Sequence, residues 1–213
     1  LRVHRYDSGS LQEVEALQLA SDWTDRIAVL NRKTSSLVVV TEYVIPPDGD
    51  VGETVVRAFE ARAQTLREIW YLTISAHVGD LVFIGEGDSS HLILETGTAE
   101  EGGDILVFKV SGRSRPILTW SGQMTQGSRC LSIEATNPSL GEVLLRSING
   151  DAAIYVLGRQ GLELKRRLSI SAGVQVVPIS RIGSTLSGAF SPSRQSQILF
   201  REARGISYHL TTF

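Results

Sequence analysis

The sequence predicts an all-β protein of antiparallel four-stranded repeat units, either a β-propeller or a propeller fragment of about four blades. Four segments share one pattern, an apolar alternating run, a short polar or glycine turn and a second alternating run: 2–17, 105–120, 154–170 and 198–213. The apolar starts Ile105, Ile154 and Ile198 lie 49 and 44 residues apart, and one further hairpin fits between successive starts. Two hairpins in about 45 residues match the size of a propeller blade, which buries its faces by stacking on its neighbours.

Additional hairpins are predicted along the rest of the chain. Runs rich in Val, Ile, Leu or aromatic residues, interrupted by turn-forming residues, lie at 27–44, 69–85, 130–148 and 174–190. We predict one β-repeat domain over residues 1–213. Leu1 and Phe213 both lie in strand-like runs, so we expect the N-terminal strand to pair with the C-terminal sheet. If the chain is a piece of a longer protein, another chain or copy would complete the exposed sheet edge instead.

The repeat is interrupted at 45–68, where we predict an inserted loop or an amphipathic helix. The run PPDGD is a turn-forming cluster, and it precedes the charged segment 51–66. Apolar residues recur there at intervals of four, which would place them on one stripe of a helix: Val51, Val55, Phe59 and Ala63. An extended strand with interleaved charges is the alternative. A helix here would pack on the β body or dock a partner.

A second irregular segment is predicted at 86–104. Its middle is acidic and rich in glycine, which favours a long exposed loop. Gly85 and Gly87 do not form a dinucleotide-binding fingerprint, because that motif must open a helix, whereas the following HLILET favours a strand.

Composition and charge narrow the class of protein. Apolar residues make up 42% and charged residues 21% of the 213 residues, which is typical of a globular domain with a packed core. The net charge of −2 does not favour nucleic-acid binding over the whole surface, although a local basic face remains open. No apolar run approaches the roughly 20 residues of a membrane-spanning helix, so we expect no membrane partner. Cys130 is the only cysteine, which favours a reducing, intracellular compartment, the cytoplasm or nucleus.

Basic side chains on the predicted hairpins are the best candidates for partner binding. The run 165–167 lies in an outer-type strand, where successive side chains face opposite sides. Such a run is commonly a solvated edge that resists edge-to-edge pairing, and the alternative is contact with an acidic partner or a nucleic-acid backbone. The predicted partner-binding set is Arg57, Phe59, Arg62, Arg113, Arg115, Lys165, Arg166 and Arg167. The three tryptophans, Trp23, Trp70 and Trp120, are interpreted as core or blade-packing residues.

One part of the chain, about 80–170, carries a longer pattern. A strand ends in Gly85, an acidic segment follows, and Gly103 to Phe108 form a strand. Later positions match an "L-L-x-S-I-N" run and the strand after it: Leu144, Leu145, Ser147, Ile148, Asn149, Ile154 and Tyr155. This pattern resembles the propeller repeats of the large damaged-DNA-binding and cleavage-polyadenylation-factor family. The resemblance implies a non-enzymatic scaffold that holds other proteins and sometimes nucleic acid. Family members are several times longer and their propellers normally hold seven blades, whereas this chain has room for about four.

The function predicted from these observations is a non-catalytic protein-interaction scaffold. The alternative is a carbohydrate-binding or glycan-processing β-protein. The sequence shows no nucleophile elbow around Ser89-Ser90-His91, and no catalytic residue, cofactor or metal site is predicted. Whether the protein is an enzyme stays open, with a non-enzyme favoured.

Overall fold

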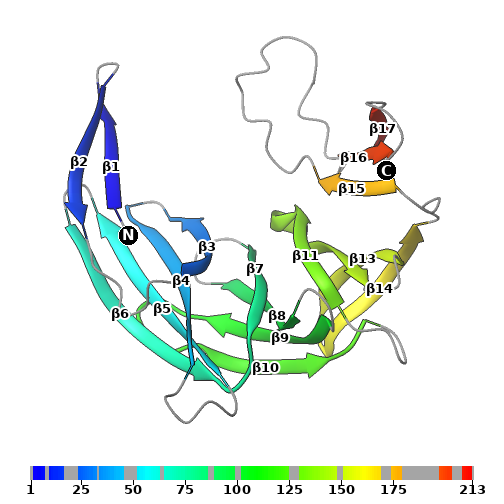
Figure 1. The fold of residues 1–213 in the computed structure, drawn as a ribbon, viewed down its shortest axis with the longest axis horizontal. Helices are drawn as coiled ribbons and strands as arrows, with labels where there is room; N and C mark the ends of the chain where they lie inside the picture. The colour runs from blue at the N-terminus through cyan, green and yellow to red at the C-terminus, as the bar shows by residue number, and fades with distance from the viewer. Residues whose placement is uncertain are drawn as a thin grey trace.

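A computed structural model describes residues 2–7, 10–16, 24–32, 34–45, 52–62, 65–85, 89–98, 102–124, 130–147, 151–168, 174–178, 197–202 and 208–212. These residues are almost entirely β-strand, and the prediction of an all-β fold of antiparallel four-stranded units is confirmed. Figure 1 shows the sheets following one another around an arc.

Three consecutive sheets form the body, each with four strands. Sheet I contains β3 (Thr24–Asn31), β4 (Ser36–Val44), β5 (Glu53–Arg62) and β6 (Thr65–Ile74). Sheet II contains β7 (Val78–Ile84), β8 (Ser90–Thr98), β9 (Gly102–Val110) and β10 (Ile117–Gly122). Sheet III contains β11 (Cys130–Asn137), β12 (Glu142–Ser147), β13 (Ala152–Gly158) and β14 (Gly161–Leu168), with a 3-10 turn at Pro138–Leu140. One bridge between Cys130 and Gly103 joins sheets II and III.

Two smaller groups of strands flank this body. A hairpin precedes it, formed by β1 (Arg2–Asp7) and β2 (Ser10–Ala16). A three-stranded sheet follows it, formed by β15 (Val174–Pro178), β16 (Gln197–Glu202) and β17 (Tyr208–Thr212). Among the described strands, no ladder joins β1 to the C-terminal sheet, so the predicted terminal pairing is not observed. The arrangement is compatible with a propeller, and no closed ring is formed by these ladders.

Most predicted hairpins are confirmed by the observed pairing. Adjacent strands pair within 2–17, 27–44, 105–120, 130–148, 154–170 and 198–213. The hairpin expected at 69–85 is wrong, because β6 pairs with β5 and β7 pairs with β8. The second half of the one expected at 174–190 lies outside the described residues. First strands begin at 24, 78, 130 and 174, so the first two repeats are longer than 45 residues.

The helix predicted at 51–66 is wrong, because β5 is extended across Glu53–Arg62. An interval of four residues is also two strand periods, so Val55 and Phe59 fit one face of a strand as well as one stripe of a helix. On the opposite face Thr54, Val56 and Ala58 are all buried. The segment 45–68 is therefore mostly sheet, since β6 begins at Thr65.

The predicted loop at 86–104 is also mostly strand. It contains β8 and the beginning of β9, while its two connecting stretches lie outside the described residues. Gly103 is required by close packing, since a Cβ atom there would overlap the carbonyl of Thr96 on the paired strand. This glycine allows two backbones to approach each other closely within the sheet.

The sheets stack face to face, and each contact buries its own core. The core between sheets I and II contains Val39, Val56, Trp70, Leu92 and Phe108, among others. The core between sheets II and III contains Ile93, Val107, Val143, Leu145 and Tyr155, among others. Each face of sheet II therefore packs against a different neighbour, which is the arrangement expected of adjacent propeller blades.

Candidate ligand groove between sheets II and III

A cavity of about 490 Å³ lies between sheets II and III, and residues of β8, β10, β13 and the start of β14 line it. Sheet II contributes His91, Thr119 and Trp120, and sheet III contributes Leu157, Gly158, Arg159 and Gly161. Cavities of this size hold small molecules or one or two side chains of a partner. We call this cavity and the adjoining face of β14 the groove.

Trp120 spans the space between the two outer strands. It pairs with Val107 in the sheet ladder and packs against the core between sheets II and III. Gly161, the first residue of β14, has φ +127° and leaves room for the indole, because a Cβ atom there would overlap the ring. A side chain is disfavoured at Gly161 for both reasons, by backbone conformation and by contact.

The groove face of sheet II combines an apolar residue with basic and neutral polar residues. Lys109 pairs with both His91 and Ile117 across the ladders, so these side chains share the face that contains the cavity lining. Burial and the nearby charge of Lys109 lower the pKa of His91 below its ordinary value of 6.5. The imidazole is therefore mostly neutral at pH 7 and can donate and accept a hydrogen bond.

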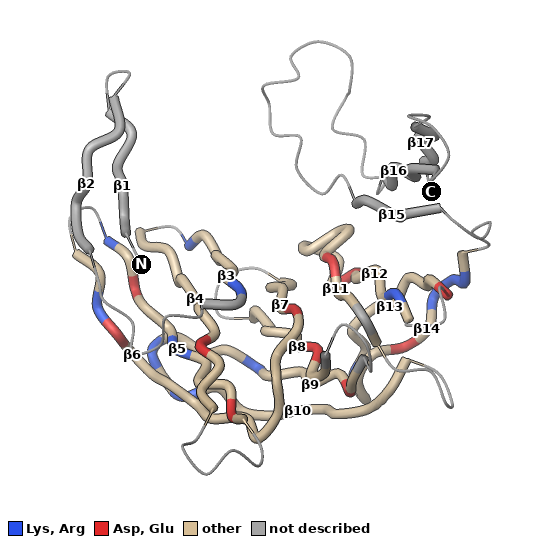
Figure 2. The backbone as a smooth tube through the Cα atoms, in the orientation of Figure 1, with Lys and Arg blue, Asp and Glu red and all other residues tan. Residues whose placement is uncertain are grey.

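The groove continues onto β14, whose residues 163–167 are all exposed. Leu164 pairs with Tyr155 and Arg167 pairs with Ala153, and both partners belong to the core facing sheet II. The ladder skips Lys165, which lies in a β-bulge. Leu164 and Arg167 thus share the groove face, although strict alternation would separate them. Figure 2 shows the basic residues along β14.

The predicted residues of β14 lie beside this groove. Lys165 makes an ion pair with Glu142, and Arg166 pairs with Ile154 on the face opposite to Arg167. Burial raises the pKa of Tyr155, and the charge of Arg167 opposes that rise. The run is brought next to the cavity by the tight turn Arg159–Gln160 between β13 and β14.

Two other predicted arginines meet on one buried carboxylate between sheets I and II. Glu60 accepts hydrogen bonds from Arg62 at 3.2 Å and from Arg113 at 2.6 Å. The hydrogen bond from Arg113 lowers the pKa of Glu60 the most, and the hydrogen bond from Arg62 lowers it further. Arg32 donates two hydrogen bonds to the carbonyl of Gly112 in the same turn, each at 3.2 Å. Arg113 therefore links sheet II to sheet I, whereas Arg62 binds Glu60 within β5, and both arginine side chains remain about half exposed.

The remaining predicted residues lie apart from the groove. Arg57 donates to Glu68 at 3.0 Å and to Glu42 at 3.2 Å. Phe59 is completely buried and packs with Val40 and Leu66 in a separate small core, so it cannot contact a partner on the surface. Arg115 is exposed in the β9–β10 turn.

A further cluster of charges lies where the first strands of the sheets approach one another. Asp80 of β7 accepts a hydrogen bond from the backbone amide of Ile133 in β11 at 3.1 Å. Its other oxygen lies 4.0 Å from Arg26 of β3. Burial raises the pKa of Glu95 to about 8 and that of Glu134 to about 7, and the charge of Asp80 adds to both shifts. Within the described residues, no three His, Cys, Asp or Glu side chains are placed to hold a metal ion.

Sequence reasoning missed Trp120, His91 and Arg159 as groove residues. A usable indication was present, because Trp70 and Trp120 occupy the outermost strands of consecutive sheets. Each packs toward the next sheet along the chain, and the prediction that these two tryptophans pack in the core is confirmed. Trp23 lies outside the described residues.

Comparison with protein-family models and with curated proteins gives no match for this chain. In the part of the chain that the structure describes, no helix is long and apolar enough to cross a membrane.

Proposed function

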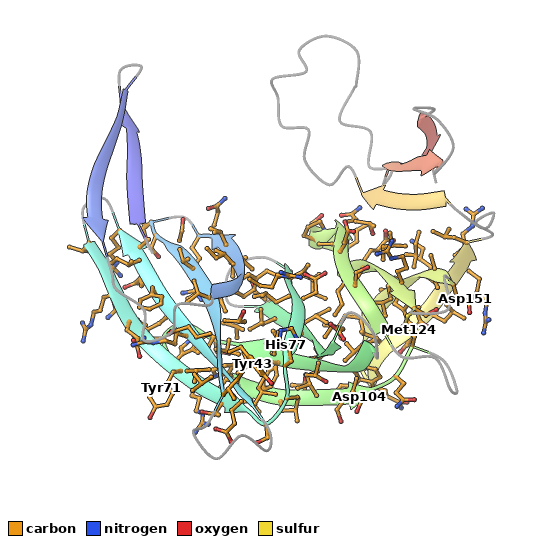
Figure 3. The ribbon with its side chains drawn as sticks, in the orientation of Figure 1. Tyr43, Tyr71, His77, Asp104, Met124 and Asp151 are labelled. Carbon is orange, nitrogen blue, oxygen red and sulfur yellow. The ribbon has the colours of Figure 1, made fainter. Side chains whose placement is uncertain are left out.

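We propose that this protein is a non-catalytic protein-interaction scaffold whose stacked sheets present their outermost strands to partners. One observation carries the proposal: all three body sheets end in an outer strand with a large exposed apolar side chain. Tyr71 on β6 is 61% exposed, Ile117 on β10 is 66% exposed and Leu164 on β14 is 45% exposed. Figure 3 shows Tyr71 pointing away from sheet I.

Exposed apolar side chains next to an open strand edge offer a surface to which a partner can bind. Among the described strands, β6, β10 and β14 each pair with one neighbour, so each leaves one edge without a ladder partner. Open edges invite association, and apolar groups beside them supply binding energy. The resemblance to the damaged-DNA-binding and cleavage-polyadenylation-factor propellers implies the same kind of role and stays a prediction. We expect an intracellular location, where the buried Cys130 thiol would remain reduced.

Site-specific photo-crosslinking in cells would test this proposal. A photoreactive residue is placed in turn at Tyr71, Ile117 and Leu164, with exposed Ser139 at the 3-10 turn as the control. We expect at least one outer-strand position to crosslink a defined protein that the control position does not reach. Equal labelling from all four positions would contradict a role for the outer strands.

A second candidate, carbohydrate binding, is favoured by one observation. The cavity combines the indole of Trp120 with the polar side chains of His91 and Arg159, and indoles commonly stack on sugar rings. Part of the indole is already covered by Gly161, which reduces the surface left for a sugar. Calorimetric titration with neutral, acidic and amino sugars tests this candidate, and no heat with any class would remove it.

A further inference from the structure

We infer that the groove and the open edge of β14 bind an extended acidic protein segment, which adds a fifth strand to sheet III and places one apolar side chain in the cavity. This inference rests on the proposed scaffold function and names the chemistry of one partner. Three observations carry it: the strand edge, the partly apolar cavity beside it and the charge along β14.

The edge of β14 can accept another strand. In the described part of the chain β14 pairs only with β13, so its other side presents backbone N–H and C=O groups without a ladder partner. An extended peptide can satisfy those groups by strand addition, and its alternate side chains then lie on the two faces of the enlarged sheet. The backbone of the segment supplies affinity, and its side chains supply specificity.

The groove face gives one of those side chains a place to bind. Side chains of the added strand on this face would lie beside Leu164 and point toward β10, where Ile117 is exposed. Trp120, Leu157 and two glycines form the apolar part of the cavity between them, and the rest of the lining is polar: His91, Thr119 and Arg159. An apolar side chain of the segment fits this lining, because its burial removes apolar surface from water on both partners.

Charge determines the composition of the rest of the segment. The groove face carries Lys109, Arg159 and Arg167, and the opposite face of β14 carries Arg166 and the bulged Lys165. Lys165 is already paired with Glu142, and Arg166 also has an interaction of its own, so both contribute less than the cations of the groove face. Glu163 is the one acidic residue of β14. Its carboxylate lies over Gly158, at the end of β14 next to the β13–β14 turn. The excess of positive charge along β14 selects Asp and Glu in the partner, although the whole chain has a net charge of −2.

A nucleic-acid strand is also acidic, but it matches fewer of these features. Phosphates would use the cations and leave the backbone edge of β14 and the exposed Leu164 without a partner. A protein segment uses the edge, the apolar cavity and the charges together. We therefore commit to the protein segment and treat single-stranded RNA as an outcome of the test.

Fluorescence anisotropy with defined peptides and the full chain tests the inference. The probe is a labelled twelve-residue peptide that alternates Glu with Val or Thr and carries one central Phe. Control peptides replace Glu with Lys, or Phe with Ala, and an oligouridine of equal length serves as the RNA probe. We expect saturable binding of the acidic Phe peptide, about tenfold weaker binding without Phe, and none with Lys.

Two further controls separate the parts of the inference. Arg167→Glu should weaken binding of the peptide about tenfold or more, while Arg67→Glu, the same charge change at an exposed position on β6 of sheet I, should leave it unchanged. Two further peptides carry N-methyl groups on the backbone amides of either the odd-numbered or the even-numbered residues. Only one of these two sets of amides donates hydrogen bonds to β14, so one methylated peptide should not bind and the other should bind normally. Equal losses of binding for the two methylated peptides would overturn strand addition.

The remaining outcomes distinguish this inference from the scaffold proposal. If oligouridine binds and every peptide fails, the acidic-segment inference is wrong and a nucleic acid is the ligand of the groove. If all probes fail while Tyr71 or Ile117 still crosslinks a protein in cells, the scaffold proposal stands and the partner binds elsewhere. If no probe binds and no outer-strand position crosslinks a protein, both the acidic-segment inference and the scaffold proposal are wrong.

Discussion

The two contacts between consecutive body sheets use the same design, and only one of them leaves a groove. Both bury an apolar core, and in both a tryptophan from an outermost strand packs toward the next sheet. Between sheets I and II, Trp70 is only 6% exposed and the six-residue turn Ser111–Pro116 reaches back to Glu60 through Arg113. Between sheets II and III the corresponding turn has two residues, Arg159–Gln160, and it borders the cavity.

Turn length therefore separates a contact that stabilises the fold from one that offers a binding site. Adjacent sheets that fan out around an arc leave their outer strands further apart than their inner strands, so material must fill the outer space. In the first contact a long turn with a basic residue bridges it. In the second, Trp120 fills part of the space, and the remaining volume is the groove. Each prediction below changes one side of this comparison and measures the other as its control.

The largest effect is expected from truncating the two tryptophans. Trp70→Ala should cost about 3–5 kcal/mol of unfolding free energy, because it leaves a cavity in a closed core. Trp120→Ala should cost clearly less, since this side chain is only partly buried beside an existing cavity. Chemical denaturation of both variants measures the difference. Equal losses would show that the two contacts are packed alike.

The next effect concerns two of the four described glycines that have positive φ, Gly161 at the start of β14 and Gly112 in the β9–β10 turn. Gly161→Ala should cost about 2–3 kcal/mol, because the backbone has φ +127° and the added methyl group meets Trp120. Gly112→Ala, at φ +53° with open space around it, should cost only about 1 kcal/mol. Thermal unfolding compares them. If the Trp120 indole moves aside to make room for the methyl group, the two variants should lose similar amounts of stability.

Strand existence could be predicted from the sequence much better than strand pairing. The hairpins at 105–120 and 154–170 are recognisable, because alternation and turn residues are local properties. The boundary inside 69–85 is not recognisable, since alternation is the same whether β6 and β7 pair or belong to different sheets. Residues 51–66 were ambiguous for a different reason, because an interval of four residues satisfies both helical and strand periods.

In the candidate site, too, the local features could be predicted from the sequence and the three-dimensional arrangement could not. The basic run 165–167 is visible in the sequence, but the face that each side chain occupies depends on the bulge at Lys165. The cavity depends on how β10 and β14 approach, which no local pattern encodes. Charge alone identifies Arg62 and Arg113 in the sequence. Only the fold reveals that Glu60, more than 50 residues before Arg113, accepts hydrogen bonds from both arginines.

Stability should depend on pH with opposite signs at the two contacts. The pKa values of Glu95 and Glu134 are raised to about 8 and about 7, above the ordinary value of 4.5 for an unfolded chain. The folded state therefore binds more protons than the unfolded state between these limits. Their contribution is full below about pH 4.5 and is lost as the pH rises toward 8. Glu95→Gln, which keeps the shape without the charge, should flatten this fall and stabilise the protein by about 1–3 kcal/mol at pH 8. An unchanged slope in denaturation from pH 5 to 8 would exclude Glu95 as its source.

The smallest effect tests the bridge between sheets I and II. The lowered pKa of Glu60 stabilises the fold above its unfolded value of 4.5, and this contribution is lost as the pH falls through the lower folded value. Arg113→Ala should destabilise more than Arg62→Ala, although both side chains are about half exposed, because Arg113 connects two sheets whereas Arg62 lies on the same strand as Glu60. Thermal unfolding at pH 7 should rank them in that order, and the ranking should vanish in a Glu60→Gln background. A ranking that survives without the Glu60 charge would mean that Arg113 acts through its turn, and the length of that turn alone would then explain why the first contact is bridged and the second is open.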